Sequence, residues 1–477
     1  MNPITKLRSA AAHLAMFRSF VTGAPIHLPS LNHLVRVHAA ENKNRAANSR
    51  RTVDPNPRFL QQALERRIRR QVQLAVCETD FYGDRFAESG INWQEVTLAH
   101  FRELPLTTKA DLRGRPEGFV RRGFSPTLRT MTTGTTGQGT SMLFTSRESQ
   151  IFTLMAALGL LRQGLISDKD IVQVSTSTRA LLGNQRAIDA YRHTGALVYQ
   201  TGVVEPERAL ALLAEQHRLP KRKSQVSILF TYPSYLGRLL KAGHASGYGP
   251  QDFGLERITI GGEVSSPGLR QRTQALFGPV AFDEGYGISE AWPFGGSYCE
   301  EGHLHFDPLR GLLEVIDPDT GQPASADTAG SLVLTPFFPF RESTILLRYD
   351  TGDMVRTLSE PCRCSLRHHP ATSHLLGKKR FCVRSADRWF GPRDLLAVLE
   401  SNLNVPLPVR FGLRLAANGY VLQVVVREAT AERQRELCDQ LQTAGIPIHS
   451  LALMTDPNQL ENPFPWRGDL HEASFTH

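Results

Sequence analysis

The sequence lacks any uninterrupted run of eighteen apolar residues, and it has only six cysteines among 477 residues. A helix needs about twenty apolar residues to cross a bilayer, so no membrane span is expected. No basic segment leads into a continuous apolar stretch, so a secretory signal peptide is not expected either. The scattered cysteines do not form a secreted-type disulfide framework. We therefore expect a cytoplasmic protein.

Acidic residues are scarce in the first fifty positions, where seven Lys and Arg residues face the single Glu41. This imbalance supplies +6 of the net charge of +9. A further basic cluster spans residues 66–70. Charge distributed in this way favours a poorly packed, basic helical arm over residues 1–50 and a solvated helix face at 66–70, rather than a nucleic-acid interface. Two alternatives for the arm are a transit peptide, on composition, and a docking segment for an acidic partner.

The segment Thr132-Thr133-Gly134-Thr135-Thr136-Gly137-Gln138-Gly139 is the most informative in the chain. Hydroxyl side chains and backbone N–H groups can surround anionic oxygens here, because glycine tolerates positive φ. The segment therefore predicts a loop that binds a nucleoside triphosphate. It is not a Walker A motif, since no Gly-Lys-Ser/Thr follows four residues after the first glycine, which argues against a P-loop NTPase. By itself, such a segment is equally well explained as a flexible surface turn.

Three more motifs follow strand-like apolar stretches in a fixed order. They are Gly261-Gly262-Glu263, Tyr286-Gly287-Ile288-Ser289-Glu290 and Tyr349-Asp350-Thr351-Gly352-Asp353. Together with the Thr/Gly loop, these motifs make the chain resemble the adenylate-forming superfamily of acyl- and aryl-CoA ligases and adenylation domains. Within it, the likeness is to the phenylacetate-CoA ligase branch, and it covers about residues 100–400.

The resemblance implies a ligase that uses ATP to adenylate a small carboxylate and then passes the acyl group to CoA, a carrier-protein thiol or an amine. Attack of a carboxylate on the α-phosphate brings two anions together, so the site needs N–H donors, a cation and a divalent metal. Glu290 is a hard oxygen ligand suited to Mg²⁺, and the resemblance gives it that role. Its alternative role is a capping or solvated carboxylate. The expected catalytic residues are Glu290, Thr133, Lys378 and Arg467.

The nucleotide site can be assigned in the same way. A carboxylate such as Asp353 can accept hydrogen bonds from two vicinal hydroxyls, and the resemblance places it on the ribose, although residues 351–353 could also form an ordinary turn. Gly261 and Gly262 would border the adenine, with Tyr286 stacked on the base. The expected nucleotide-binding residues are Thr132, Thr133, Gly134, Thr135, Thr136, Gly137, Gly261, Gly262, Glu263, Asp283, Glu284, Tyr286, Gly287, Ser289 and Asp353.

Apolar and aromatic residues near these motifs predict an acyl pocket for a small aromatic carboxylate. The expected substrate-binding residues are Tyr232, Ser234, Phe282 and Trp292, with Phe294 beside them. Clefts for small molecules are lined mainly by such side chains with a few polar groups. Each of these aromatics could equally be a core residue.

The cysteines predict a second kind of site. Cys362-Arg363-Cys364 is a close pair, and Cys299 precedes His303 and His305. Three thiolates and one imidazole make a closed tetrahedral zinc site. The resemblance favours Cys299, His305, Cys362 and Cys364 as the ligands of a structural Zn²⁺. The alternative is a set of buried free thiols beside exposed histidines.

Alternating strand-like and helical segments predict an α/β fold, with a large layered domain of mixed sheets and helices over 51–376 and a small α+β domain over 377–477. The resemblance makes the small domain a lid that turns on a hinge near Gly377 between adenylation and thiol transfer. Expected elements include helices at 58–77, 147–164, 392–402 and 430–443, and strands at 311–316, 330–335 and 381–383.

Lysine is missing where relatives use it. Gln138 stands at the loop position that usually carries Lys, and Gly377-Lys378-Lys379-Arg380 replaces the usual Gly-Arg-x-Asp-Asp. No lysine follows Lys379, so the usual C-terminal catalytic Lys is absent, and Arg467 is the nearest cation to its place. Arg differs from Lys in geometry and hydration. These departures leave open an enzyme with a non-thiol acceptor, such as an amino or nitrogen-oxide group, and a non-catalytic nucleotide-binding relative.

Overall fold

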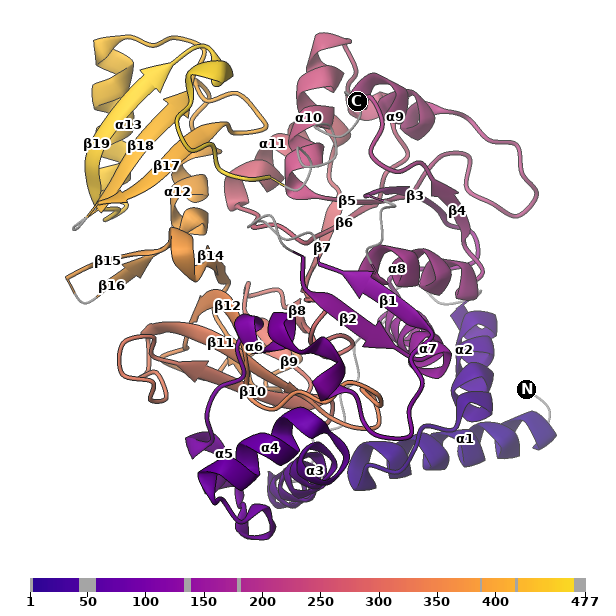
Figure 1. Cartoon of the computed structure of the whole chain (residues 1–477). Coiled ribbons are helices and arrows are strands. Elements are labelled where there is room, and N and C mark those ends of the chain that lie inside the picture. The colour runs from indigo at the N-terminus through magenta and orange to yellow at the C-terminus, as the bar shows by residue number, and fades with distance from the viewer. Residues whose placement is uncertain are drawn as a thin grey trace.

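A computed structural model describes residues 3–42, 57–132, 139–177, 182–386, 388–416 and 419–466. Figure 1 shows the C-terminal unit at the upper left, above a larger body built from the rest of the chain. Within the described ranges, no helix is both long enough and apolar enough to span a bilayer.

An eight-stranded sheet forms the centre of the large body, in the order β13-β9-β8-β7-β6-β5-β3-β4. Five neighbouring strands are parallel, and β3 is buried along its whole length, as expected when helices cover both faces of a sheet. This confirms the α/β class. The strands are β3 (Ile171–Ser175), β4 (Leu197–Gln200), β5 (Ile228–Thr231), β6 (Arg257–Gly261), β7 (Ala281–Tyr286), β8 (Gly296–Tyr298), β9 (Leu304–Phe306) and β13 (Ala371–Thr372).

The helices of this α/β layer are α7 (Ser146–Arg162), α8 (Leu182–His193), α9 (Pro206–Ala214), α10 (Pro233–Ala245) and α11 (Pro267–Phe277). Strands β5, β6 and β7 run parallel, so their carboxyl ends meet at one edge of the sheet. Tyr232, Gly262 and Gly287 each follow one of these strand ends. The topology therefore brings three sequence motifs to the same edge.

A second sheet, of four antiparallel strands, lies beside the first in the order β10-β11-β12-β14. Its strands are β10 (Gly311–Ile316), β11 (Ala329–Pro336), β12 (Tyr349–Arg356) and β14 (Leu375–Lys378). The expected strands at 311–316 and 330–335 are confirmed. In the β12–β14 pairing Asp353 lies opposite Lys378, so two residues far apart in sequence become neighbours.

A short antiparallel hairpin of β1 (Leu128–Met131) and β2 (Ser141–Phe144) flanks the Thr/Gly segment. The N-terminal helices are α1 (Pro3–Thr22), α2 (Leu28–Asn42), α3 (Pro57–Glu78), α4 (Asp80–Ser89), α5 (Leu98–Glu103) and α6 (Lys109–Gly114). A capping box between Thr108 and Asp111 fixes the start of α6. This start places Lys109 at the first helical position.

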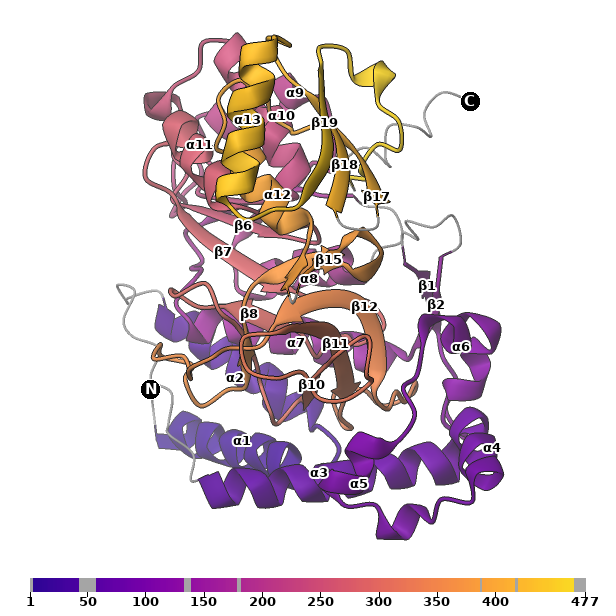
Figure 2. The ribbon, with the colours of Figure 1, turned by 90° about the vertical axis from the view of Figure 1, so that its left-hand side faces the viewer.

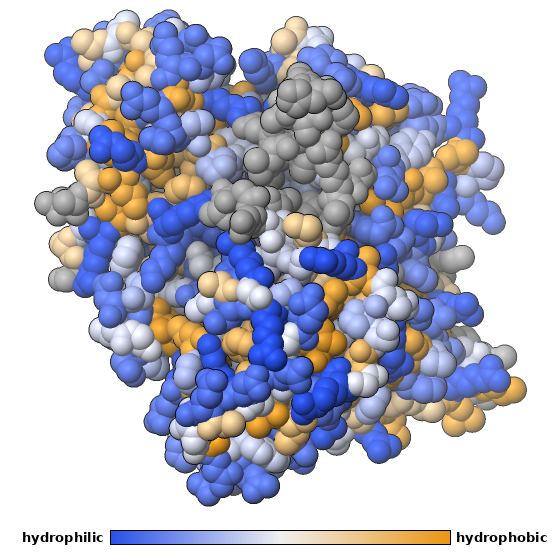
Figure 3. Space-filling model, in the orientation of Figure 1, coloured by the Kyte–Doolittle hydropathy of each residue, from blue (hydrophilic) through white to orange (hydrophobic). Residues whose placement is uncertain are grey.

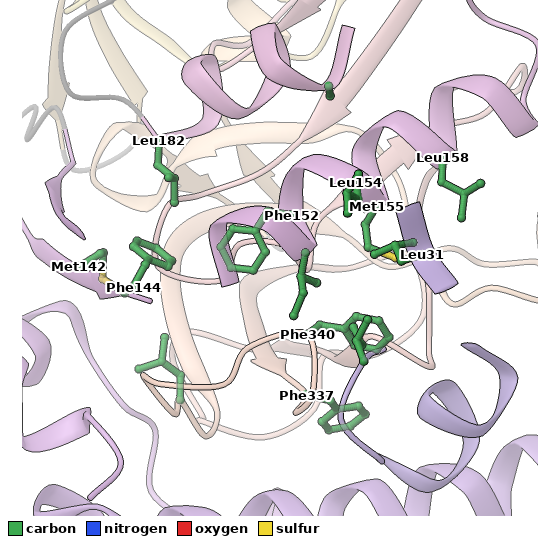
Figure 4. Packing of buried hydrophobic residues seen from close by; sticks show 14 of the residues in the cluster. Leu31, Met142, Phe144, Phe152, Leu154, Met155, Leu158, Leu182, Phe337 and Phe340 are labelled. Carbon is green, nitrogen blue, oxygen red and sulfur yellow. The ribbon is translucent and has the colours of Figure 1, made fainter. Parts of the chain in front are cut away.

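The expectation of a poorly packed arm is wrong for α2. Leu31, Leu34 and Val35 are at most 2% exposed and belong to the main core cluster. Figure 4 shows Leu31 beside Met155 of α7. Apolar residues at i, i+3 and i+4 make a buried helix stripe, and the basic composition of the segment concealed this pattern.

The C-terminal unit has the expected α+β composition, with three strands, β17 (Phe411–Ala416), β18 (Gly419–Val425) and β19 (Ile448–Met454), and two helices, α12 (Pro392–Leu399) and α13 (Ala431–Thr443). A small hairpin of β15 (Val383–Ser385) and β16 (Arg388–Phe390) precedes them. The expected strand at 381–383 is wrong in position, because a 3-10 turn occupies Lys379–Phe381. Figure 2 shows this unit stacked against α10 and α11.

The contact between the C-terminal unit and the large body is close. A β-carbon on Gly237 of α10 would lie 2.9 Å from Pro408 Cα, and one on Gly268 of α11 would lie 2.7 Å from the Glu400 carbonyl carbon. Arg272 donates a hydrogen bond of 2.9 Å to the Val405 carbonyl. One hydrophobic cluster continues from α10 and α11 into the C-terminal unit. The C-terminal unit therefore packs directly against Gly237 and Gly268, where a larger side chain would clash with it.

Glu400 is buried in this contact and predicts a pH dependence. Its carboxyl group accepts a hydrogen bond from Ser266, and burial raises the pKa of Glu400 from 4.5 to about 7. A carboxyl group whose pKa is higher in the folded than in the unfolded state contributes its full stability at pH values below the unfolded-state pKa. For Glu400 this contribution, about 3 kcal/mol of unfolding free energy, is lost as the pH rises through about 7. We expect Glu400→Gln to melt like the wild type at pH 5 and at a higher temperature at pH 8. Equal melting temperatures at both pH values would contradict this.

Candidate functional site

A cavity that is partly open to solvent lies where the carboxyl ends of β6 and β7 meet β12, β14 and the C-terminal unit. The large body lines it with Gly262, Glu263, Val264, Glu284, Gly285, Tyr286, Gly287, Ile288, Tyr298 and Asp353. Strand β14 and the C-terminal unit add Leu375, Gly377, Lys378, Arg380, Phe381, Arg393, Phe464, Pro465 and Trp466. Motifs that are distant in sequence therefore share one hollow with the C-terminal unit.

Asp353 is the polar centre of this cavity and is only 3% exposed. Its Oδ2 accepts hydrogen bonds from the Tyr286 hydroxyl and from Lys378 Nζ, each 2.8 Å long. Burial, together with the Asp353 charge, raises the pKa of Tyr286 well above its ordinary value, so this phenol stays protonated and donates. Lys378 also donates to the Thr351 carbonyl at 3.3 Å. A carboxylate is thus held in place by a neutral donor and a cation.

Glu290 follows β7 and is 4% exposed. The Tyr349 hydroxyl donates to its Oε1 at 3.2 Å, and Lys109 Nζ lies 3.4 Å from the same oxygen. Burial and the Glu290 charge raise the pKa of Tyr349 well above its ordinary value. Burial lowers the pKa of the neighbouring Arg341 to about 10, which the charges of Glu148 and Glu290 partly offset. The Tyr349 hydroxyl and the Lys109 ammonium are therefore both directed at the Glu290 carboxyl group.

The remaining expected nucleotide residues differ in their contacts. Glu263 accepts from the Ser234 backbone N–H at 2.8 Å and from its hydroxyl at 2.9 Å. Glu284 lines the cavity and pairs with Arg270. Asp283 instead pairs with Arg257 at 2.9 Å, and neither it, Gly261 nor Ser289 lines the cavity. The structure thus brings together only part of the expected set.

The expected substrate-binding residues do not line this cavity. The Tyr232 hydroxyl accepts from Asn184 Nδ2 at 2.8 Å. The Phe282 ring lies 5.2 Å from the Arg270 guanidinium. The Trp292 ring packs on Gly287, where a β-carbon would lie 2.8 Å from it. Their role in binding an acyl group stays a prediction.

Several expected site residues lie outside the described residues, namely Thr133, Gly134, Thr135, Thr136, Gly137 and Arg467. The structure does describe residues that flank them in the sequence. Thr132 Oγ1 accepts from the Thr140 backbone N–H at 3.0 Å and closes the base of the β1–β2 hairpin. At the other end of the chain, Pro465 and Trp466 line the cavity, and the Trp466 indole donates to the Val409 carbonyl at 2.9 Å. Arg467 therefore follows two residues of the cavity wall.

The four expected zinc ligands meet in one buried group. The ligand atoms of Cys299, His305, Cys362 and Cys364 all lie within 4.8 Å of one another. The Cys299 and Cys362 sulfurs are 3.7 Å apart, and the Cys364 sulfur is 3.3 Å from His305 Nε2. His305 Nδ1 lies 3.2 Å from the His369 carbonyl, and the Leu366 N–H donates to the Cys364 sulfur at 3.1 Å. His303 is not in this group, which agrees with the preference for His305.

Sequence reasoning missed Lys109, Tyr298 and Arg393. Lys109 contacts Glu290 from the start of α6, and the signal for that position was the Thr108–Asp111 capping box that precedes the first motif. Arg393 follows Gly391-Pro392 at the start of α12 and donates to the Ser265 carbonyl. The Tyr298 hydroxyl accepts from the Leu375 backbone N–H at 3.0 Å. No local pattern marked Tyr298.

Comparisons with known proteins agree with this arrangement. No family model matches the chain. The sequence is 27% identical, over 327 residues, to phenylacetate-coenzyme A ligase of Thermus thermophilus, in a match that covers 66% of this chain and 69% of that protein. A crystal structure of 2-hydroxyisobutyryl-CoA ligase in the postadenylation state, with R3-HIB-AMP, superposes with a TM-score of 0.70 at 18% identity, covering 89% of this chain and 94% of that one. An anthranilate CoA ligase in complex with anthranoyl-AMP gives 0.52 at 13% identity, covering 72% and 66%.

The chain shares its fold with solved CoA ligases. Its sequence is similar to that of phenylacetate-CoA ligase.

Proposed function

We propose that this protein is an ATP-dependent ligase that adenylates a small carboxylate and transfers the acyl group to CoA. In the first step a carboxylate oxygen attacks the α-phosphate and pyrophosphate leaves. In the second step a thiolate attacks the acyl carbon and AMP leaves. The observation that carries the proposal is the convergence of Asp353, Tyr286 and Lys378 on one cavity that is also lined by the segment preceding Arg467.

Asp353 has the chemistry required of a ribose ligand. A carboxylate offers several lone-pair sites, so it can accept from vicinal hydroxyls while Tyr286 and Lys378 hold it in place. Gly262 and Gly287 let backbone approach a flat base closely, because neither has a side chain. The aromatic rings of Tyr286 and Tyr298 supply stacking surface. These residues would bind and orient the nucleoside.

Glu290 fits a magnesium site of the kind the resemblance implies. It is a buried carboxylate and a hard oxygen ligand, and it lies 3.4 Å from the Lys109 ammonium. When bound there, Mg²⁺ would neutralise charge on the phosphates of ATP. Tyr349 would keep the carboxylate oriented through its hydroxyl.

Arg467 is proposed as the cation that takes the place of the usual C-terminal lysine. We expect Arg467→Ala to reduce adenylation about 100-fold or more, the size of effect seen when one stabilising donor is removed from a site of developing charge. Arg435→Ala, on an exposed face of α13, is the matched control and should leave the rate unchanged. Pyrophosphate release measures both. An unchanged rate for Arg467→Ala would remove this residue from the mechanism and leave Lys378 as the candidate.

The acceptor is proposed as CoA because the similar proteins include CoA ligases. A carrier-protein thiol, or an amino or nitrogen-oxide group, is the second candidate, favoured by the altered hinge sequence at 377–380. The decisive experiment is pyrophosphate release with ATP, Mg²⁺ and a panel of aryl, aliphatic and amino acids, without acceptor and then with CoA or hydroxylamine. Release that rises with CoA supports the ligase. ATP binding without pyrophosphate release from any acid would support the non-catalytic alternative.

The Cys299, His305, Cys362 and Cys364 group is proposed as a structural zinc site. Tetrahedral Zn²⁺ with Zn–S bonds of about 2.3 Å requires sulfurs a little under 4 Å apart, which agrees with the 3.7 Å between Cys299 and Cys362. The His369 carbonyl lies where it can orient a ligating His305 imidazole through Nδ1. All four residues are buried, so the site would be closed and would not take part in the reaction.

A further inference from the structure

Helix α1 buries one face against the protein and exposes several large hydrophobic side chains, together with Lys6, Arg8 and Arg18, on the other. The buried residues are Ser9, Ala12, Met16, Ser19 and Val21, each less than 9% exposed. The opposite face carries Ile4, Leu7, Leu14 and Phe17, which are 62%, 72%, 69% and 55% exposed, with Ala10 and Ala11 between them. Four of the eight exposed large hydrophobic side chains in the described part of the chain lie on this one helix. A concentration of this kind indicates that another molecule covers the outer face.

The position of α1 leaves that face accessible. Figures 1 and 2 place α1 at the edge of the molecule, at the opposite end from the C-terminal unit. In Figure 3, orange side chains are visible at the lower right edge, where α1 lies. Phe17 also stacks on Phe59 of α3, with ring centroids 6.2 Å apart and an interplanar angle of 5°, which extends the apolar surface. A partner could bind here without covering the cavity.

The spacing of the exposed apolar residues identifies the partner. Ile4 and Phe17, Leu7 and Leu14, and Ala10 and Ala11 are placed symmetrically about the midpoint of positions 10 and 11. In an antiparallel pair of identical helices related by a two-fold axis through that midpoint, each residue faces its symmetric counterpart. The small alanines then lie at the crossing, where helix axes approach to about 8–10 Å. The pattern is self-complementary.

We propose that α1 is the interface of a homodimer in which two copies pack antiparallel through Ile4, Leu7, Leu14 and Phe17. In this register Lys6, Arg8 and Arg18 face positions 15, 13 and 3 of the second copy, none of which is Lys or Arg. No acidic residue lies in Pro3–Thr22, so an interface dominated by charge pairs is excluded and apolar burial is the driving force.

The expected affinity is modest. The proposed interface consists of one helix face from each copy, which puts it at the low end of the size range of specific interfaces. A dimer of this size forms reversibly, so its population should depend on protein concentration between about 1 and 100 μM. Sedimentation velocity over this range, on the full-length protein, measures the equilibrium directly.

The test is the double variant Leu7→Glu/Leu14→Glu, which places four carboxylates in the interface because each substitution occurs twice. We expect its dissociation constant to rise at least tenfold. The matched control is Leu403→Glu/Leu219→Glu, since Leu403 is 74% and Leu219 46% exposed and both lie outside α1. The control should dimerise like the wild type. A wild type that stays monomeric up to about 100 μM, or a dimer that survives the α1 variant, would overturn the proposal.

Disulfide trapping tests the register independently of stability. In a background with the exposed Cys77 and the partly exposed Cys438 changed to Ser, Ala10→Cys should cross-link two copies under mild oxidation, because position 10 adjoins the two-fold axis. Ile4→Cys should not, since two copies of residue 4 would lie about 20 Å apart along the helices. Ile4→Cys/Phe17→Cys should restore the cross-link. Efficient cross-linking through Ile4→Cys alone would contradict the antiparallel register. A protein that stays monomeric but binds anionic vesicles would show that α1 docks on a lipid surface and would overturn the homodimer.

Discussion

Glu290→Gln should reduce pyrophosphate release by at least about 1,000-fold while the protein stays folded. The substitution keeps the shape and the hydrogen bond from Tyr349 but removes the negative charge that would hold Mg²⁺. Loss of metal-based charge stabilisation costs several kcal/mol in the transition state, and each 1.36 kcal/mol is a factor of ten in rate. The measurement is the rate of pyrophosphate release with the best acid of the panel at saturating Mg²⁺.

Tyr349→Phe is the matched control for this prediction. It removes the hydroxyl that donates to the same carboxylate oxygen at 3.2 Å and leaves the charge intact. We expect an effect of less than about 100-fold, the worth of one hydrogen bond to a charged group. If Glu290→Gln kept more than a tenth of wild-type activity, or if both variants lost activity equally, Glu290 would be a structural carboxylate and the proposed magnesium role would be wrong.

If the proposed zinc site is correct, Cys364→Ser should abolish zinc binding and lower the melting temperature by about 5–10 °C. Loss of a structural metal is among the few single changes that cost about 4 kcal/mol or more, because the remaining ligands are left buried without a partner. In a chain of this size such a cost corresponds to a shift of several degrees. Metal analysis of purified protein, never exposed to chelator, should give about one equivalent of zinc for the wild type and less than half an equivalent for the variant.

Cys382→Ser separates a metal effect from a general effect of removing a buried thiol. Cys382 is 3% exposed, comparable to 4% for Cys364, but it lies outside the four-residue group. We expect Cys382→Ser to retain zinc. A wild type with no bound zinc, or equal metal content in the two variants, would show that the cysteines are buried free thiols.

The large architecture was accessible from the sequence because its signals are local. Alternating strands and helices around residues 171–286 predict the parallel sheet, and the motifs follow strand ends, so their meeting at one edge follows from topology. The Cys362-Arg363-Cys364 pair and Cys299 near two histidines predict a metal site, the resemblance selects His305, and the fold brings these four residues together. Residues with a recognisable chemistry and spacing can therefore be identified without a three-dimensional structure.

Other features depend on contacts between distant segments, which local patterns do not predict. Lys109 reaches Glu290 only because α6 lies beside the second sheet, and Asp353 meets Lys378 through strand pairing across more than twenty residues. Helix α2 was expected to pack poorly because it lies in the basic segment 1–50, yet a short apolar stripe suffices to bury it. Composition describes a whole segment, whereas packing depends on one face of it.

The close contacts at Gly237 and Gly268 make the tolerance of these two positions to substitution depend on the orientation of the C-terminal unit. The atoms nearest to a β-carbon at either position belong to that unit, from Pro408 in one case and from Glu400 and Ser401 in the other. We propose that the unit turns between the two half-reactions, as the resemblance implies. In a library of single substitutions, we therefore expect alanine and serine at both positions to pass a selection for folding and to impair only the half-reaction that uses the orientation seen here. The substitutions tolerated at Gly237 and Gly268 would then indicate the orientation of the C-terminal unit in each half-reaction.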